Sequence, residues 1–350
     1  MIETIRVCLV GCGRAGLVHA HNLSGHIPRA RLVAVVDVDE PQAKEAAHEL
    51  RIRDSFSSLE TALKSVAFDA VVITTPTFTH APLIIAAAQA GKHVFSEKPL
   101  CVTLQEADHI EASLDEAEVK FQIGLMRRFD TSFLEAKRLI AEGAVGVPIL
   151  VKSVGRGPGL PPPWYIDPKK SNGVLAEVNS HDFDAMRWLM GREFKRVFAV
   201  AGNFKCAEYR SRHPDFYDTA TVNLTFDDGT LGLLDGCCPA TYGYDARMEV
   251  LGTEGMIQVG AQQAHSVLVW NRNNQLVTEG NRSWRTLFRE AYRAEMAHFV
   301  DCILNGEAPR VGLEAGRKAL EAVIAANTSI RTGQPVDMGA VSSPSHGRKV

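Results

Sequence analysis

The stretch VGCGRAG, residues 10 to 16, decides the fold of the first part of this chain. It follows an apolar run, 5–10, and opens a segment of helical composition, 16–24. Glycines spaced G-x-G-x-x-G between a strand and a helix are typical of dinucleotide-binding turns. They let the backbone approach a pyrophosphate at the helix N-terminus. We therefore expect a dinucleotide to contact Gly11, Gly13, Arg14, Ala15 and Gly16.

Asp37 ends the next apolar run, 32–36, at the distance from the glycines that the dinucleotide pattern requires. A carboxylate at this place hydrogen-bonds the ribose hydroxyls and repels a 2′-phosphate. Val38 and Asp39 provide no cation for such a phosphate. The sequence therefore favours NAD over NADP, with a tight turn and an ordinary acidic strand end as the alternative.

Strand and helix patterns alternate over residues 1–125. Strands are predicted at 5–10, 32–36, 69–73, 94–95 and 121–124, and helices at 16–24, 40–50, 81–90 and 104–118. Such alternation indicates βαβ units with a parallel sheet, and the continuous apolar runs indicate strands that are covered on both faces. We expect a doubly wound Rossmann domain over 1–125.

The pattern changes after residue 125. Strand-like stretches separated by turn signals predict an α+β domain over 126–335 with a large, mostly antiparallel open sheet. The strands are expected at 149–154, 197–204, 220–226, 231–236, 247–251, 256–259 and 266–270, and the helices at 133–142, 174–190, 284–304 and 313–331. Residues 155–170 form a long glycine- and proline-rich loop, and 336–350 form a polar tail, expected to be disordered from 342.

Composition narrows the class of protein. The chain has 350 residues, of which 45% are hydrophobic, and a net charge of -3, so nothing attracts it to nucleic acid or to an anionic membrane. No apolar run reaches the ~18 residues of a membrane span, and no signal-peptide pattern is seen. The seven cysteines form no CxxC pair and indicate reduced, buried thiols in a cytoplasmic protein. A reactive thiol at Cys12 or Cys101 stays open.

Polar residues follow the later strands of the first half. FSEKP, 95–99, places Glu97 and Lys98 at the end of an apolar run, and Pro99 prevents ladder pairing beyond them. The carboxyl ends of parallel strands border the ligand crevice, so these side chains point to a site. Four residues after or near the 69–73 strand are also candidates, although each alone is more often a cap or turn residue: Thr74, Thr75, Pro76 and His80.

These motifs together carry a resemblance. The glycine loop, TTPTFTH (74–80), SEKPL (96–100) and HDFD (181–184) resemble the Gfo/Idh/MocA oxidoreductases over about residues 4–335. Within that family the chain is most similar to the inositol 2-dehydrogenases. That closer similarity lies in LMRRFD (125–130), GPGLPPPWYI (157–166), YGYDARMEVLGTEG (242–255) and AYRAEMAHFVDCI (291–303).

The resemblance implies roles for single residues. Lys98 corresponds to the lysine that reaches the nicotinamide ribose and the reacting hydroxyl, and Pro99, often after a cis peptide, fixes the turn that aims it. Glu97 would contact the cofactor side, and His181 matches the presumed general base. Residues expected on the nicotinamide or substrate side are Arg127, Arg156, Trp164, Tyr165 and Tyr244.

Glu177 stands where family members commonly have an aspartate, four residues before His181. On one continuous helix the two side chains would share a face, and the acid could orient the ring or bind a substrate hydroxyl. A metal site made by His181 with Asp182 and Asp184 is an alternative interpretation. With one local histidine, and a family that uses no metal, we expect none.

The sequence thus predicts an NAD-dependent dehydrogenase that oxidises a secondary alcohol of a cyclic polyol or sugar. Lys98, His181 and Glu177 are the expected catalytic residues, and the family's habit predicts a homodimer or homotetramer through the exposed face of the large sheet. One alternative is oxidation of a ring carbon in a glycoside or modified sugar with tightly bound NAD. A distant one is a non-catalytic, cofactor-binding regulator.

Overall fold

The computed structural model describes residues 4–160, 162–209 and 211–341, and the chain divides into two compact units. The first unit contains Met1–Phe129 and Glu290–Leu320, and the second contains Asp130–Arg289 and Glu321–Val350. The sequence-based boundary placed 290–320 in the second domain, so the compact units differ from it there. Part of the predicted tail, 342–350, lies outside the described residues.

The first unit is built on a six-stranded sheet in the order β3-β2-β1-β4-β5-β6, with every pair parallel. This is the strand order of a doubly wound dinucleotide-binding sheet, so the predicted fold class is confirmed. The strands are β1 (Ile5–Val10), β2 (Ala30–Val36), β3 (Asp54–Phe56), β4 (Ala70–Ile73), β5 (His93–Glu97) and β6 (Phe121–Gly124). Sequence patterns missed β3 because it has only three residues, all half-buried.

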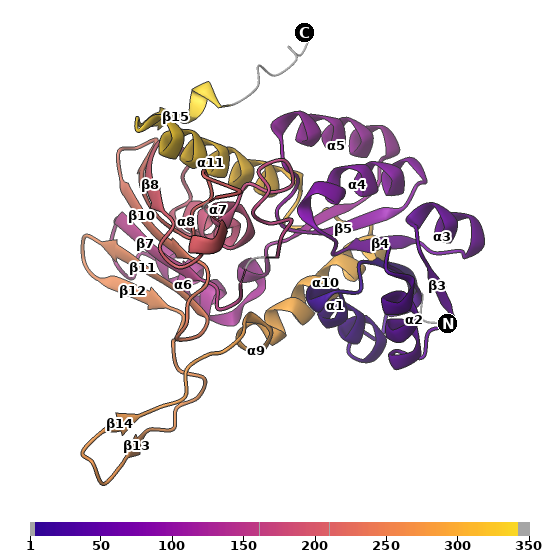
Figure 1. Ribbon diagram of the computed structural model, residues 1–350, viewed down its shortest axis with the longest axis horizontal. Coiled ribbons are helices and arrows are strands. Elements are labelled where there is room, and N and C mark those ends of the chain that lie inside the picture. Colours follow the sequence, from indigo (N-terminus) through magenta and orange to yellow (C-terminus); the bar gives the residue numbers. More distant parts are fainter. Residues whose placement is uncertain (1–3, 161, 210, 342–350) are drawn as a thin grey trace. The chain divides into compact units, whose positions relative to one another are not determined.

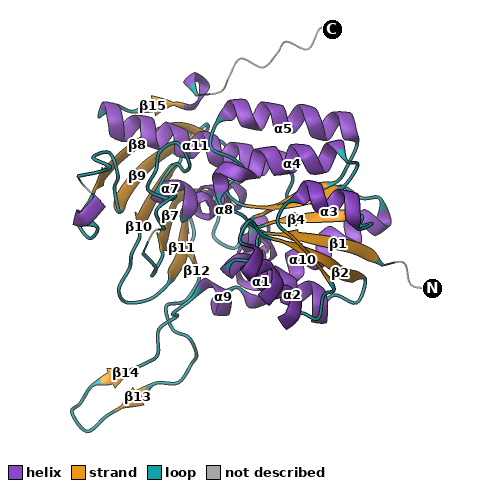
Figure 2. Ribbon diagram, turned by 45° about the vertical axis from the view of Figure 1, so that its right-hand side comes forward, coloured by secondary structure: helices purple, strands orange, loops and turns teal. Residues whose placement is uncertain are grey.

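Helices cover both faces of this sheet (Figure 2). They are α1 (Arg14–Gly25), α2 (Glu40–Glu49), α3 (Leu59–Ser65), α4 (His80–Gln89), α5 (Leu104–Ala117) and α10 (Arg289–Asn305). Although α10 comes late in the chain, its Met296, Phe299 and Val300 join Leu9 and Leu23 in one buried core. This packing explains why residues 290–305 belong to the first unit.

The second unit is built on a seven-stranded sheet in the order β12-β11-β7-β10-β9-β8-β15. Only β7 and β10 pair in parallel within the described sheet, so the predicted large, mostly antiparallel sheet is confirmed. Its strands are β7 (Pro148–Arg156), β8 (Phe194–Gly202), β9 (Thr219–Phe226), β10 (Leu231–Cys237), β11 (Asp245–Gly252), β12 (Met256–Val259) and β15 (Val336–Asp337). The last of these falls in the predicted polar tail.

One face of the second sheet carries helices and the other is open. Burial alternates along β7, β8 and β10, with the buried residues on the side of the helices. These helices include α6 (Thr131–Ala141), α7 (Val174–Glu177), α8 (Ser180–Met190) and the later part of α11 (Leu313–Thr332). A small hairpin, β13 (Val269–Trp270) with β14 (Leu276–Val277), extends from the unit (Figure 1).

Three predicted elements are corrected by the structure. The helix expected over 174–190 is two helices, α7 and α8. Between them, the Asn179 side chain donates to the Gly155 carbonyl oxygen on β7 at 3.0 Å. The helix expected over 284–304 is likewise divided into α9 (Trp284–Leu287) and α10. The strand expected over 266–270 is regular only at Val269–Trp270. Within the described part of the chain, no helix has the length and apolar character needed to cross a membrane.

Candidate active site

The glycine loop has the geometry that a dinucleotide requires. Gly11 has a φ of +99°, and a Cβ there would lie 2.8 Å from the Thr74 carbonyl carbon. A Cβ on Gly16 would lie 1.9 Å from the Gly11 oxygen, so both glycines are needed for the turn itself. A Cβ on Gly13 would meet nothing within 4 Å. Gly13 is the N-cap of α1, which has no side-chain cap and no acid in its first turn, so its N–H groups suit a pyrophosphate.

Asp37 lies at the end of β2 and is fixed by the backbone. Its Oδ2 accepts the Cys12 N–H at 2.8 Å, and its Oδ1 accepts the Asp39 N–H at 3.0 Å. The carboxylate therefore lies directly beside the glycine loop. A side chain so placed can accept hydrogen bonds from a ribose and repel a phosphate on that ribose. The residues present thus fit NAD.

Burial makes a reactive thiol at Cys12 or Cys101 unfavourable. Cys12 lies in the glycine loop and Cys101 follows the Lys98–Pro99 turn, and both are buried. Burial, with the neighbouring Asp37, raises the pKa of Cys12 to about 12, and burial also raises the pKa of Cys101 above its usual range. Both residues are therefore thiols at neutral pH and poor nucleophiles.

Thr74, Thr75, Pro76 and His80 lie after β4, at the same sheet edge as the glycine loop. The Thr74 hydroxyl donates to the Gly11 carbonyl at 2.7 Å and so ties the two loops together. The ring nitrogens of His80 lie 2.8 Å from the Thr75 oxygen and 2.7 Å from the Pro99 oxygen. Burial lowers the pKa of His80, although both carbonyls favour the protonated ring. In this arrangement His80 links the β4 loop to the turn that bears Lys98.

The turn after β5 presents Lys98. The Glu97 Oε2 accepts the Lys98 backbone N–H at 3.2 Å, and the Lys98–Pro99 peptide is cis. Opposite Glu97 on β6 is Gly124, where a Cβ would lie 3.1 Å from the Glu97 carboxyl carbon. The Lys98 side chain is half-buried, whereas Arg127, which follows β6, is only 1% exposed. The first unit thus gathers every predicted cofactor residue at the carboxyl ends of its strands.

In the second unit, His181 lies in the first turn of α8 and is buried. The residues beside it fix the start of this helix on the sheet. Asp182 accepts the Ser153 hydroxyl at 2.6 Å and an Asn179 amide N–H at 2.8 Å. A Cβ on Gly155 would lie 2.0 Å from the Asp182 carboxylate. The absence of a side chain at Gly155 therefore allows Asp182 and Asn179 to pack directly against the backbone of β7.

Glu177 ends α7 and is separated from His181 by the break at Val178 and Asn179. The predicted continuous helix through Glu177 and His181 is therefore wrong. The Glu177 carboxylate accepts the Ser171 hydroxyl at 2.7 Å, and Ser171 in turn accepts the Gly173 N–H at 3.0 Å. Glu177 is half-buried, and its carboxylate is held by Ser171 in the loop that precedes α7.

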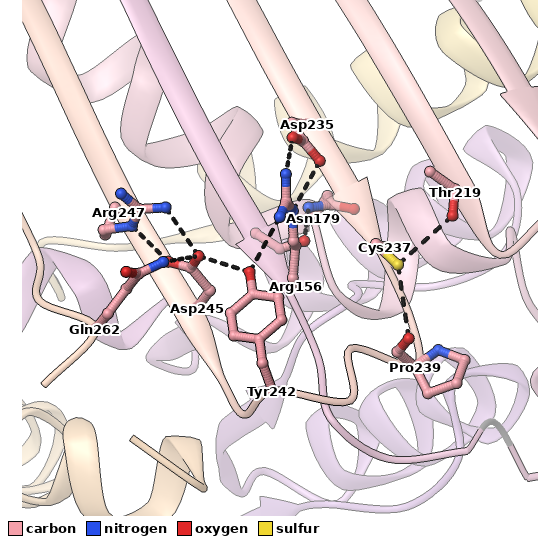
Figure 3. A network of polar contacts seen from close by, with 11 residues as sticks. Arg156, Asn179, Thr219, Asp235, Cys237, Pro239, Tyr242, Asp245, Arg247 and Gln262 are labelled. Carbon is pink, nitrogen blue, oxygen red and sulfur yellow. Dashed lines mark hydrogen bonds and ion pairs between the residues drawn. The ribbon is translucent and has the colours of Figure 1, made fainter. Parts of the chain in front are cut away.

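Arg156 ends β7 and takes part in a polar network (Figure 3). Its Nε donates to Asp235 Oδ1 at 3.0 Å, a second guanidinium nitrogen also reaches Asp235, and a third donates to the Tyr242 hydroxyl at 3.1 Å. Tyr242 donates at 2.7 Å to Asp245, which is paired with Arg247. The Asp235 carboxylate helps to raise the pKa of Arg156 further. The structure thus gives Arg156 protein partners across neighbouring strands.

The aromatic candidates for substrate contact are mostly packed. Tyr165 is buried beside Trp164, with ring centroids 6.2 Å apart, and burial raises its pKa well above its usual range. Tyr244 is buried with its ring edge toward Phe288, at a centroid distance of 6.3 Å. Trp164 is half-buried and is the most accessible of the three.

Sequence reasoning missed two residues of the first unit. His19 and Glu295 lie on buried stripes of α1 and α10, and both contribute to a cluster with Glu97. The sequence did contain a signal for these two residues, because each is a polar side chain at a position where the helical spacing of apolar residues predicts burial.

The first unit has the strand order and the glycine loop of a Rossmann domain that binds NAD, and the second is an α+β domain built on a mostly antiparallel sheet. Residues 5–125 match the family described as oxidoreductase family, NAD-binding Rossmann fold, and residues 133–258 match the GFO/IDH/MocA C-terminal domain. The chain belongs to the Gfo/Idh/MocA family, as the sequence motifs predicted.

Relatives align over almost the whole chain. The scyllo-inositol 2-dehydrogenase (NAD(+)) of Bacillus subtilis is 36% identical and covers 97% of both chains. The myo-inositol 2-dehydrogenase of Thermotoga maritima is 34% identical over 96% of this chain and 99% of its own. The crystal structure of scyllo-inositol dehydrogenase from Lactobacillus casei with bound NAD(H) and scyllo-inositol has a TM-score of 0.89. It is 28% identical and covers 96% of this chain and 100% of its own.

Proposed function

We propose that this protein is an inositol 2-dehydrogenase-like enzyme that oxidises a secondary alcohol of a cyclic polyol or sugar. The observation that carries the proposal is the near full-length similarity to inositol dehydrogenases, combined with a glycine loop and Lys98 turn that are intact in the first unit. A buried His181 on a fixed helix start in the second unit supports it.

The proposed chemistry divides the work between three side chains. Bound NAD supplies the hydride acceptor. His181 takes the proton of the substrate hydroxyl, and Lys98 stabilises the negative charge that develops on its oxygen. Glu177 binds a substrate hydroxyl from the loop side. General acid–base help of this kind supplies a rate factor of about 10² to 10⁴, or ~3–5 kcal/mol.

A substrate panel tests the proposal. Inositol isomers, monosaccharides and glycosides are incubated with NAD, and reduced cofactor is followed by its absorbance. Fastest turnover of an inositol is expected. Preference for a glycoside would favour the modified-sugar alternative, and no turnover with any polyol, although NAD binds, would favour a regulator.

Asp37→Ala should weaken NAD binding and reduce the preference for NAD over NADP. A lost charged hydrogen bond costs ~1.5–3 kcal/mol, which corresponds to about 10- to 100-fold in affinity. Because Asp37 also holds the Cys12 and Asp39 backbone, affinity for both cofactors can fall, so the ratio of the two kcat/KM values is the measurement that reports the charge. Glu40→Gln, an exposed acid nearby, is the control. An unchanged ratio would contradict the role of Asp37.

Glu177→Gln should raise the KM for the best polyol by about 10- to 100-fold, because a charged hydrogen bond to a substrate hydroxyl is lost. Glu177→Asp should change the ranking of polyols and retain activity. Ser171→Ala removes only the hydroxyl that orients Glu177 and serves as the comparison. Steady-state kinetics with the same substrate panel measure the KM values and the ranking of polyols for each variant. If the Gln variant keeps the wild-type KM and ranking, another residue sets the specificity.

We also propose that the open face of the second sheet binds a second copy of this chain. Leu231 on β10, Leu150 on β7, Leu251 on β11 and Met256 on β12 are in register and form an apolar row across four neighbouring strands. Three of them are more than a third exposed. The charged side chains beyond this row, such as Lys152 with Glu249, are already paired, so the face offers apolar contact to an identical face.

Light scattering tests the assembly. We expect a particle of two or four chains. A mass near the 38.2 kDa of one chain at micromolar concentration would contradict the proposed interface.

A further inference from the structure

A buried cluster lies directly behind the turn that presents Lys98. His19 from α1, Glu97 from β5 and Glu295 from α10 bring their nitrogen and oxygen atoms within 4.8 Å of one another. His19 and Glu295 are completely buried, and Glu97 is only 6% exposed. Three elements that are distant in the sequence therefore place two carboxyl groups and an imidazole in one interior site.

Hydrogen bonds distinguish the two carboxyl groups. Glu97 accepts the Lys98 backbone N–H at 3.2 Å, and its other carboxylate oxygen lies 2.8 Å from His19 Nε2. Neither oxygen of Glu295 has a hydrogen-bonding partner among the described residues. Two nearby buried carboxylates cannot both stay ionised, so the proton belongs on Glu295, which has no donor, and not on Glu97, which accepts the Lys98 N–H.

The electrostatics agree with this assignment. Burial, and then the charge of Glu97, raise the pKa of Glu295 well above its usual range. Among the described His, Cys, Asp and Glu residues, Glu97 and His19 lie beside Glu295, and the Tyr292 ring lies beside the His19 ring, with centroids 5.6 Å apart. Burial and the charge of Glu97 both favour the neutral acid at Glu295.

The contact between His19 and Glu97 indicates a proton between them, not a cation. Their atoms are 2.8 Å apart, which is a hydrogen-bond distance. Two ligands of one zinc ion, each at ~2.0–2.2 Å, would be held farther apart than this in a tetrahedral site. The His19 ring is also packed against Phe95 at 5.0 Å, which fixes its direction toward Glu97.

We propose that His19, Glu97 and the neutral acid of Glu295 form a positioning cluster for the Lys98 turn. Glu97 holds the Lys98 backbone, His19 holds Glu97, and Glu295 preserves this arrangement only while it carries its proton. When Glu295 loses the proton, it repels Glu97 and displaces the turn. The proposal rests on the proposed function in one respect, namely that Lys98 acts on the substrate.

Unfolding measured against pH tests the proton on Glu295 without any substrate. The folded pKa of Glu295 is raised, so its contribution to stability is complete below the unfolded value. That contribution is lost as the pH rises toward the folded value. Glu295→Gln keeps the shape of the neutral acid and cannot ionise. Its Tm should match the wild type near pH 5 and exceed it increasingly toward pH 9. The ratio of unfolding constants should change by up to about tenfold per pH unit in that window. A Tm difference independent of pH would overturn the assignment.

Activity tests the positioning. Glu295→Gln should keep kcat near wild type at pH 7 and lose less of it in alkaline buffer. His19→Phe retains the ring packing but removes the donor to Glu97, so kcat should fall by about 10- to 100-fold with KM little changed. His19→Gln, whose amide replaces that donor, should recover most of the loss. Equal kcat in His19→Phe and His19→Gln would overturn the positioning role.

Failure of the proposed function would be recognised separately. If the wild type oxidises no polyol, the pH dependence of Tm still decides the state of Glu295. Fluorescence of bound NADH then replaces kcat, because it reports the surroundings of the nicotinamide. His19→Phe should change that fluorescence relative to His19→Gln, and identical spectra would exclude a cluster that acts through the turn.

Discussion

Lys98→Met should lower kcat by about 10² or more while the protein remains folded. The Lys98 side chain is half-buried and lies outside the core, and the contact that fixes the turn uses its backbone N–H, which the substitution retains. In the proposed mechanism, the substitution removes the positive charge that would stabilise the developing alkoxide. Single-turnover and steady-state kinetics with the best polyol measure the effect, and thermal unfolding confirms the fold.

Lys92→Met is the matched control for this variant. Lys92 precedes β5 at its opposite end, and its ammonium lies over the Phe68 ring at 5.5 Å from the centroid. The same substitution at the wrong end of the same strand should leave kcat unchanged. Near-normal turnover in Lys98→Met would exclude Lys98 from the chemical step.

His181→Ala should lose a similar factor in kcat, and the acid limb of the kcat/KM profile should disappear. A general base must be neutral to take the hydroxyl proton, so wild-type activity should fall as the pH drops if His181 has the proposed role. Since His181 is buried, His181→Asn provides a second variant with a smaller cavity. His109→Ala, at an exposed position of α5, is the control. A retained acid limb in both His181 variants would show that another group is the base.

The double variant Lys98→Met/His181→Ala shows whether the two residues work in one step. If it is no slower than the poorer single variant, they act as a unit. Losses that add in free energy would instead indicate independent contributions, because residues without a shared role usually combine additively.

Local sequence determined the cofactor half of the protein. Gly11 and Gly16 are fixed by contacts within one βα turn and with the neighbouring strand end, and Asp37 follows at the end of the next strand. Parallel strands bring all of their carboxyl ends to one sheet edge. The approximate positions of Thr74 and Lys98 therefore followed once the alternation of strands and helices was recognised.

Only the tertiary structure decided the remaining features. Two helices, and not one, contain Glu177 and His181, and Asn179 between them binds the Gly155 carbonyl on a strand that is distant in the sequence, a contact invisible to helical periodicity. Residues 290–305 joined the first unit because the apolar face of α10 completes its core. The partners of Arg156 are Asp235 on β10 and Tyr242, which precedes β11. Both strands lie beside β7 only in the folded sheet, so the sequence alone did not reveal these contacts.

The polar cluster behind Lys98 shows most clearly what sequence patterns cannot predict. His19 and Glu295 each lie among apolar residues on the buried stripe of a helix, and nothing local connects them. Their meeting with Glu97 depends on how α1 and α10 pack on the same face of the sheet. A pattern with a period of 3.6 residues predicts which face of a helix is buried, but not which side chain of another element it will meet there.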